Sequence, residues 1–134
     1  MLPYSSIPNS LLVNMVELIN KVLSQTDVEC RLSFPTASLW AIPIPLGQNA
    51  VEFQATSAGN NQEHWNFRLS VRSSNIDDKY KKPELTGDWL RFVREKSLRK
   101  GNKIILTMEV EANGVRHYNI GAEMKLMGSW IPIP

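Results

Sequence analysis

The chain has 134 residues, of which 43% are hydrophobic, so it is long enough for one compact core and too short for two ordinary domains. A formal net charge of only +2 excludes a protein that bulk charge alone would hold to a polyanion at physiological salt. The single cysteine, Cys30, excludes an intramolecular disulfide, and no signal region or long apolar run is present, which predicts a soluble intracellular protein with no membrane partner.

The first periodic segment, residues 12–23, has two interpretations. Its apolar side chains recur at the spacing of a helix, which Asn9 or Ser10 could cap, but the same segment could be a strand that enters a sheet. Periodicity alone favours the helix. The apolar positions are Leu12, Met15, Val16, Ile19, Val22 and Leu23.

The middle of the chain is typical of strands. Apolar and polar residues alternate over residues 51–56 and again over 64–72, and the intervening letters SAGNN are typical of a turn. These segments therefore predict an antiparallel hairpin. Its inward positions would be Val51, Phe53, Ala55, Trp65, Phe67, Leu69 and Val71.

A short helix is predicted after this hairpin, because Trp89, Phe92 and Val93 lie on one side of a helical turn. Thr86 or Asp88 could cap it, and Gly101 could end the turn that follows. A second hairpin is predicted around Asn113-Gly114, a pair suited to a tight turn with positive backbone angles, and the last residues, SWIPIP, are predicted to be extended. One helix among many strands favours a barrel or sandwich.

Charge is distributed unevenly along the chain. Residues 68–103 contain eleven basic and five acidic side chains, whereas the rest of the chain has four basic and eight acidic ones. This predicts a basic region, although only a fold can show whether it forms one face. The basic residues of the helical segment and the turn after it are predicted to be a solvated face: Arg91, Arg94, Lys96, Arg99 and Lys100.

Catalytic and metal-binding patterns are missing from the sequence. His64 and His117 lie in different predicted hairpins and have no acidic or thiol partner at metal-ligand spacing. There is also no nucleotide-binding glycine loop and no nucleophile elbow. The sequence therefore predicts a protein that is not an enzyme and has no catalytic residue, metal, cofactor or small-molecule substrate.

The central block of the chain resembles the plant B3-type DNA-binding domain. The shared residues occur in order as Leu85-Thr86, Gly87, Trp89, Phe92-Val93, Leu98 and Gly101-Asn102 before Ile104, with asparagine where the family usually has aspartate. Residues 21–28 are similar to the first strand and turn of the family, and residues 31–35 to its arginine-leucine-x-x-proline strand. The resemblance spans about residues 16–120.

The resemblance implies a mostly β fold, an open seven-stranded pseudobarrel with short helices at its ends. It also implies that residues 16–23 form a strand and not the helix that periodicity favours. We accordingly expect an N-terminal extension over residues 1–15 and a single domain over residues 16–134. Trp65, Phe67, Trp89 and Phe92 are then expected in the core, whereas Trp40 either packs under its loop or is exposed.

Two arms that grip the major groove are implied by the same resemblance. The first arm, residues 35–48, offers Thr36 and Ser38 but no basic residue, so its phosphate contacts are weakened. The second arm, residues 71–82, offers side chains that can read base edges and lysines that can contact phosphates. These expected DNA-binding residues are Arg72, Ser73, Ser74, Asn75, Lys79, Lys81 and Lys82.

The resemblance implies sequence-specific binding to double-stranded DNA and a role in transcriptional regulation in the nucleus. An alternative hypothesis is a degenerate pseudobarrel that serves as a protein-protein interaction module, with weak or no DNA binding. The uncharged first arm and the apolar tail of residues 124–134 favour this alternative. Possible protein partners belong to both hypotheses.

Overall fold

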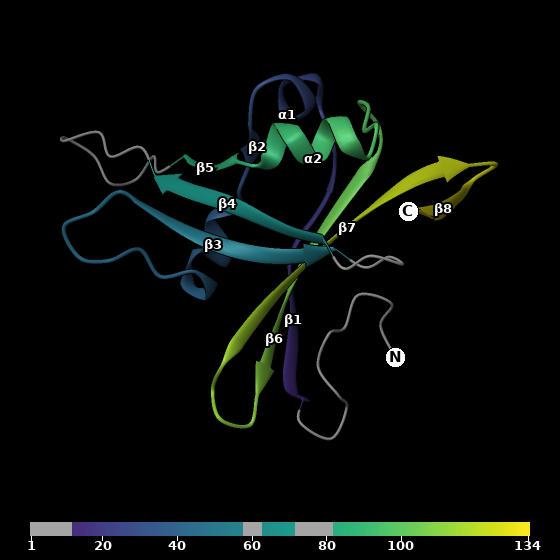
Figure 1. Cartoon of the computed structure of the whole chain (residues 1–134). Coiled ribbons are helices and arrows are strands. Elements are labelled where there is room, and N and C mark those ends of the chain that lie inside the picture. The colour runs from purple at the N-terminus through teal and green to yellow at the C-terminus, as the bar shows by residue number, and fades with distance from the viewer. Residues whose placement is uncertain (1–11, 58–62, 72–81) are drawn as a thin grey trace.

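The computed structural model describes residues 12–57, 63–71 and 82–134. Strands dominate these ranges, with three short helical segments between them (Figure 1). In chain order the elements are β1 (Leu12–Val22), α1 (Gln25–Glu29), β2 (Leu32–Ser33), η1 (a 3₁₀ helix, Thr36–Ala41), β3 (Ala50–Ser57), β4 (Glu63–Val71), β5 (Pro83–Gly87), α2 (Trp89–Glu95), β6 (Lys103–Glu111), β7 (Arg116–Leu126) and β8 (Ser129–Ile133).

The strands form one strongly curled sheet. Seven of them follow the order β1-β6-β7-β3-β4-β5-β2, and β8 pairs with β7 outside this path. Every paired neighbour is antiparallel except β3 and β7, which run parallel over residues 55–57 and 118–120. Figure 1 shows the two halves of the sheet crossing where β3 meets β7, with α1 and α2 together at one end. The expected open, seven-stranded pseudobarrel with short helices at its ends is thus confirmed.

Strand β1 contains the segment for which periodicity favoured a helix, and that interpretation is wrong. Its pairing with β6 is interrupted by register shifts between Leu12 and Asn14 and between Glu17 and Ile19. A bulge inserts one residue and breaks the alternation of faces, so the adjacent Leu18 and Ile19 are both buried. Because the alternation of apolar and polar residues is interrupted, periodicity alone did not predict a strand for this segment.

The core is built around aromatic side chains from β4 and α2. Trp65, Phe67, Trp89 and Phe92 are almost completely buried, as predicted. The ring of Phe92 meets the Trp65 ring edge-on with centroids 4.9 Å apart and stacks on the Trp89 ring at 5.9 Å. Both buried indoles are hydrogen-bonded, which removes the cost of burying an unpaired donor: Trp65 Nε1 donates to Ser57 Oγ at 3.1 Å and Trp89 Nε1 to the carbonyl of Asp27 at 2.7 Å.

The predicted hairpins both form. The turn of the first, residues 58–62, lies outside the described residues, and the turn of the second differs from expectation. β3 and β4 pair antiparallel from Ala50↔Ser70 to Ser57↔Glu63, as predicted. Between β6 and β7, only Gly114 of the Asn113-Gly114 pair has a positive φ, and Gly114 N–H donates to the Glu111 carbonyl, so the loop has three residues and not two. The tight turn with two positive φ angles lies instead at Met127-Gly128, between β7 and β8.

The connection from β5 into α2 explains the Leu-Thr-Gly-Asp-Trp letters of the central block. Gly87 has a φ of +74°, and a Cβ there would lie 2.7 Å from the Asn66 carbonyl oxygen. Asp88 is the N-cap of α2, but its carboxylate makes no capping bond; it accepts from the backbone N–H of Asn66 at 2.8 Å and from Arg91 at 3.1 Å. In this block, Gly87 makes the close contact between β5 and β4, and Asp88 begins α2 directly after it.

Asp27 organises the other helix. Ser24 and Asp27 form a capping box at the start of α1, and the buried Asp27 carboxylate also accepts from Lys21 Nζ. Burial raises the pKa of Asp27, but the hydrogen bonds from Lys21 and Ser24 outweigh it and hold the pKa below its ordinary value of 3.8. One side chain thus fixes the path from β1 into α1.

Candidate nucleic-acid interface

The bases of the two arms lie at the same end of the strands that flank them, β2, β3, β4 and β5. The first arm lies between β2 and β3, and the second lies between β4 and β5. At their bases the backbone N–H of Val71 donates to the Asn49 carbonyl at 2.8 Å, and Phe34 N–H donates to the Pro83 carbonyl at 2.9 Å. Figure 1 shows the end of β4, the start of β5 and the loop before β3 on one side of the molecule, away from β8. The backbone therefore joins the two arms at their bases.

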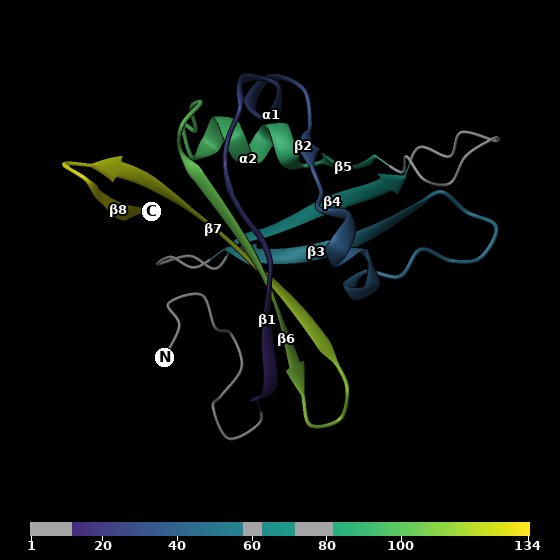
Figure 2. The ribbon, with the colours of Figure 1, turned by 180° about the vertical axis from the view of Figure 1, so that it is seen from behind.

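The start of the first arm is the helical turn η1, which packs against β1. Ser38 Oγ donates to the Leu18 carbonyl of β1 at 2.7 Å, and Ala41 and Ile42 are buried in the core. Figure 2 shows η1 as the dark-blue helical turn in front of β3 and β4. The Ser38 hydroxyl proton is thus engaged within the protein, while Thr36 is exposed.

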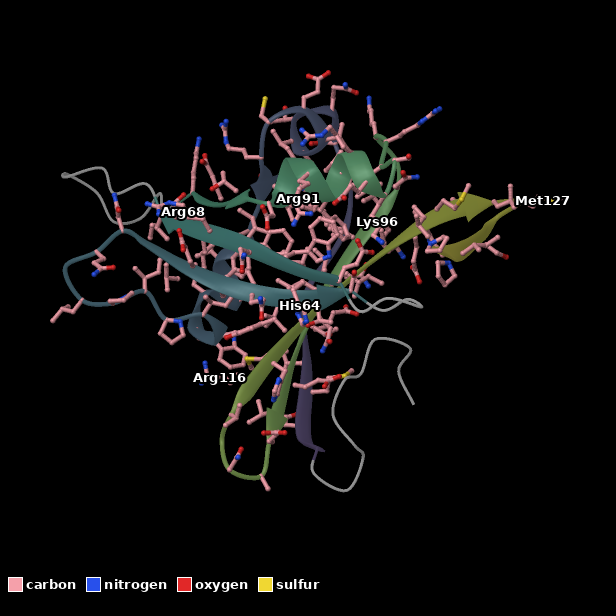
Figure 3. All side chains as sticks on the ribbon, in the orientation of Figure 1. His64, Arg68, Arg91, Lys96, Arg116 and Met127 are labelled. Atoms are coloured by element: carbon pink, nitrogen blue, oxygen red, sulfur yellow. The ribbon has the colours of Figure 1, made fainter. Side chains whose placement is uncertain are left out.

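Two side chains from β7 hold the other end of η1. Arg116 Nη1 and the Tyr118 hydroxyl both donate to the Ala41 carbonyl, at 2.9 Å and 2.7 Å. Arg116 is labelled in Figure 3. Burial raises the pKa of Tyr118, although the neighbouring Arg116 guanidinium lowers it in part, so the phenol is protonated at neutral pH and can donate. Sequence reasoning missed both residues, because no local pattern marks a contact between positions 75 and 77 residues apart.

The tip of the first arm is a tight turn. Gln48 N–H donates to the Pro45 carbonyl at 3.0 Å, and Gly47 has a φ of +82°. A positive φ at the third position is the mark of a type II turn, which puts Leu46 at the second position. Leu46 is fully exposed, and Trp40 on η1 is 56% exposed. The first arm therefore presents apolar side chains, and residues 35–48 contain no charged residue.

The second arm lies mostly outside the described residues. Six of its expected DNA-binding residues fall there: Arg72, Ser73, Ser74, Asn75, Lys79 and Lys81. Lys82, the seventh, is described; it is exposed and directly precedes β5 at the base of the arm. Of the nine predicted site residues, the structure thus places Thr36, Ser38 and Lys82, and places them at the arms.

The basic region of the sequence is divided in space. Arg68 lies on the outer face of β4, 3.9 Å from Glu52, and is labelled near the arms in Figure 3. Arg91 pairs with Asp88 and Glu95, and Lys96 Nζ lies 2.7 Å from Glu63 Oε1. The basic side chains at α2 thus pair with acidic side chains of the same chain. This is expected for a solvated helix face and not for a row of phosphate contacts.

Other kinds of site have little support among the described residues. Within residues 12–57, 63–71 and 82–134, no group of three or more His, Cys, Asp or Glu side chains could hold a metal ion. His64 is exposed beside the Thr56 hydroxyl, and His117 lies 3.5 Å from Glu111. In the same ranges no helix has the length and apolar character needed to cross a membrane.

The curled seven-stranded sheet, with the bases of the two arms at one end of its strands and short helices beside it, has the fold of a B3-type pseudobarrel. A solved structure that shares it is the "Arabidopsis FUS3-DNA complex", with a TM-score of 0.61, 20% identical residues, and coverage of 80% of this chain and 96% of that chain. This likeness shows the fold. Scans against protein-family models and against curated proteins found no match.

Proposed function

We propose that this chain binds double-stranded DNA in a sequence-specific manner, through the major groove, with its two arms. The observation that carries the proposal is the backbone link between the bases of the arms, made by Val71 with Asn49 and by Phe34 with Pro83. Two loops fixed to one another at their bases can grip one duplex from two sides. The solved structure that shares the fold is a complex with DNA, which supports the same function.

The second arm supplies the charged contacts in this proposal. Arg72 can make a bidentate contact to guanine, Asn75 can do so to adenine, and Ser73 and Ser74 can contact either base. Lys79, Lys81 and the exposed Lys82 contact phosphates and provide attraction that does not depend on sequence. The first arm contributes Thr36 and the oxygen of Ser38, whose proton is already used on the Leu18 carbonyl.

As a B3-type DNA-binding domain, the chain would act in transcriptional regulation in the nucleus and would not be an enzyme. The proposal requires no cofactor, because base reading and phosphate contact use only side chains and backbone.

Selection of bound sequences from a random duplex pool tests the proposal directly. The selected duplex and a scrambled one are then compared by fluorescence anisotropy at several salt concentrations. We expect one enriched motif and a clear ratio between the two affinities. A steep salt dependence without any preference would show a nonspecific electrostatic binder, and no binding even at low salt would reject the proposed function.

A protein-interaction module is the second candidate, and the β7–β8 hairpin favours it. Met124, Leu126, Met127 and Ile131 are exposed on this hairpin, which projects from the sheet (Figure 1). Contiguous exposed apolar side chains of this kind mark contact surfaces in many proteins. Sedimentation of the purified chain, alone and with extract, tests it: a monomer that recovers no partner would count against an interaction module.

A further inference from the structure

The tip of the first arm is anchored to the sheet on both sides. Pro43 and Pro45 fix their own φ angles, and Gly47 provides the positive φ that the turn needs. Before the turn, η1 is fastened to β1 and β7 through Ser38 and Ala41; after it, the carbonyl of Asn49 accepts from Val71. Leu46 is therefore exposed on a hydrogen-bonded turn whose two flanks are anchored to the sheet.

The chemistry of this tip limits what it can contact on DNA. Residues 35–48 have no cation, so the arm cannot neutralise a phosphate, and the side chain at the tip has no hydrogen-bonding group. In the major groove, the apolar group offered by the bases is the C5-methyl of thymine. Because Leu46 is fully exposed, it need not leave a packed position to approach such a group, and the contact removes apolar surface from water.

We propose that Leu46 determines part of the sequence preference by contacting a thymine C5-methyl in the major groove. This rests on the proposed function, because it assumes that the arms lie in that groove. The first arm then reads sequence by apolar contact, while the second arm supplies the charge. A preorganised arm gains affinity because little conformational entropy is lost when it binds.

Replacement of thymine by deoxyuridine tests the contact, because it removes the methyl group and leaves the base-pairing groups unchanged. Each thymine of the selected duplex is replaced in turn, and binding of the wild-type chain and of Leu46→Ala is measured at several salt concentrations. For the wild type we expect one replacement to weaken binding about fourfold, the factor for one buried methyl group. In Leu46→Ala the same replacement should have no effect, and the salt slope should equal that of the wild type.

Met127→Ala is the matched control, because Met127 is also exposed at the tip of a tight turn and lies on the far hairpin (Figure 3). It should keep the full response to deoxyuridine. Equal responses of wild type and Leu46→Ala at every thymine would reject the contact while leaving DNA binding intact. If Trp40→Ala removes the response and Leu46→Ala does not, the contact belongs to η1 and the assignment to Leu46 is wrong. Failure of the wild type to bind any duplex would reject the proposed function as well.

Discussion

At the scale of single residues, Gly87 shows how one position can join two strands and a helix. Its positive φ is a conformation that other residues rarely adopt, and its missing side chain leaves room for the backbone of β4. The backbone N–H of Asp88, the next residue, donates to the Asn66 carbonyl at 2.9 Å. Any side chain at position 87 would push this contact apart.

We expect Gly87→Ala to lower the free energy of unfolding by about 2–4 kcal/mol, from backbone strain together with the clash against Asn66. Gly101→Ala is the matched control, since Gly101 also has a positive φ but has no atom within 4 Å of the added Cβ. Its cost should be about 1 kcal/mol, from strain alone. Urea unfolding of both variants measures the difference, and equal costs would show that the close contact is unimportant.

Asp27 makes a different kind of contribution, which depends on pH. Because its folded pKa lies below 3.8, the ionised carboxylate stabilises the fold above that pH, and the contribution is lost as the pH falls through the folded pKa. Asp27→Asn should therefore lower the free energy of unfolding at pH 7 by about 2 kcal/mol, through the weakened capping box and the loss of the charge that Lys21 pairs with.

Unfolding measured from pH 7 to pH 2.5 tests this contribution of Asp27. The difference between Asp27→Asn and the wild type should narrow as the pH falls from 3.8 towards the lower folded pKa of Asp27, because the stabilisation from the ionised carboxylate is lost over that range. Glu29→Gln, an exposed change in the same helix, controls for the loss of one negative charge. A difference that stays constant down to pH 2.5 would mean that Asp27 acts by shape alone.

At the scale of elements, η1 depends on contacts that its own sequence does not contain. Its last carbonyl, that of Ala41, is satisfied by two donors from β7, and its Ser38 hydroxyl is tied to β1. Most 3₁₀ helices are shorter than these six residues, because their hydrogen-bond geometry is poor. Strands β1 and β7 therefore stabilise η1 at the start of the first arm.

Tyr118→Phe removes one of these donors and keeps the ring that packs edge-on against Phe53 at 5.1 Å. We expect a loss of about 1 kcal/mol in unfolding free energy, with Arg116 still bound to the Ala41 carbonyl. Amide hydrogen exchange should become faster over residues 36–42 and remain unchanged in β6. Unchanged exchange in η1 would show that Arg116 alone is sufficient to hold it.

At the scale of the whole molecule, the two ends carry different surfaces. The first arm and the ends of β4 and β5 that flank the second arm lie at one side of the sheet, whereas the β7–β8 hairpin projects from the other (Figure 1). On this hairpin the Trp130 ring lies 4.1 Å from Lys103 Nζ. DNA held between the arms would meet Lys82 and would leave Lys125 on the hairpin untouched. The position of a cation in the fold, and not its number in the chain, then decides its effect on binding.

Lys82→Ala should weaken binding to every duplex by a similar factor and reduce the slope of log affinity against log salt by about 0.9, the value for one phosphate contact. Lys125→Ala removes the same charge at the opposite end and should change neither quantity. Anisotropy titrations with the selected and scrambled duplexes measure both variants. Equal effects of the two substitutions would indicate that only net charge matters and that Lys82 makes no specific contact.

Features that depend on near neighbours could be predicted from local patterns in the chain. Alternation predicted β3 and β4, the spacing of Trp89, Phe92 and Val93 predicted α2, and both hairpins were placed correctly. The central block also indicated the fold through its resemblance to the B3 family, and the structure gives Gly87 of that block a close contact with the backbone of β4. Such patterns are readable because each element buries one face of its own.

Features that depend on distant partners could be seen only in the folded chain. The bulges of β1 are set by pairing with β6, and they remove the period that would have identified the strand. The type II turn with Leu46 at its tip, the double contact of β7 with Ala41 and the engaged Ser38 hydroxyl were not predicted. Buried polar groups form hydrogen bonds with residues far away in the chain that folding brings near. Local sequence patterns do not predict which residues these are.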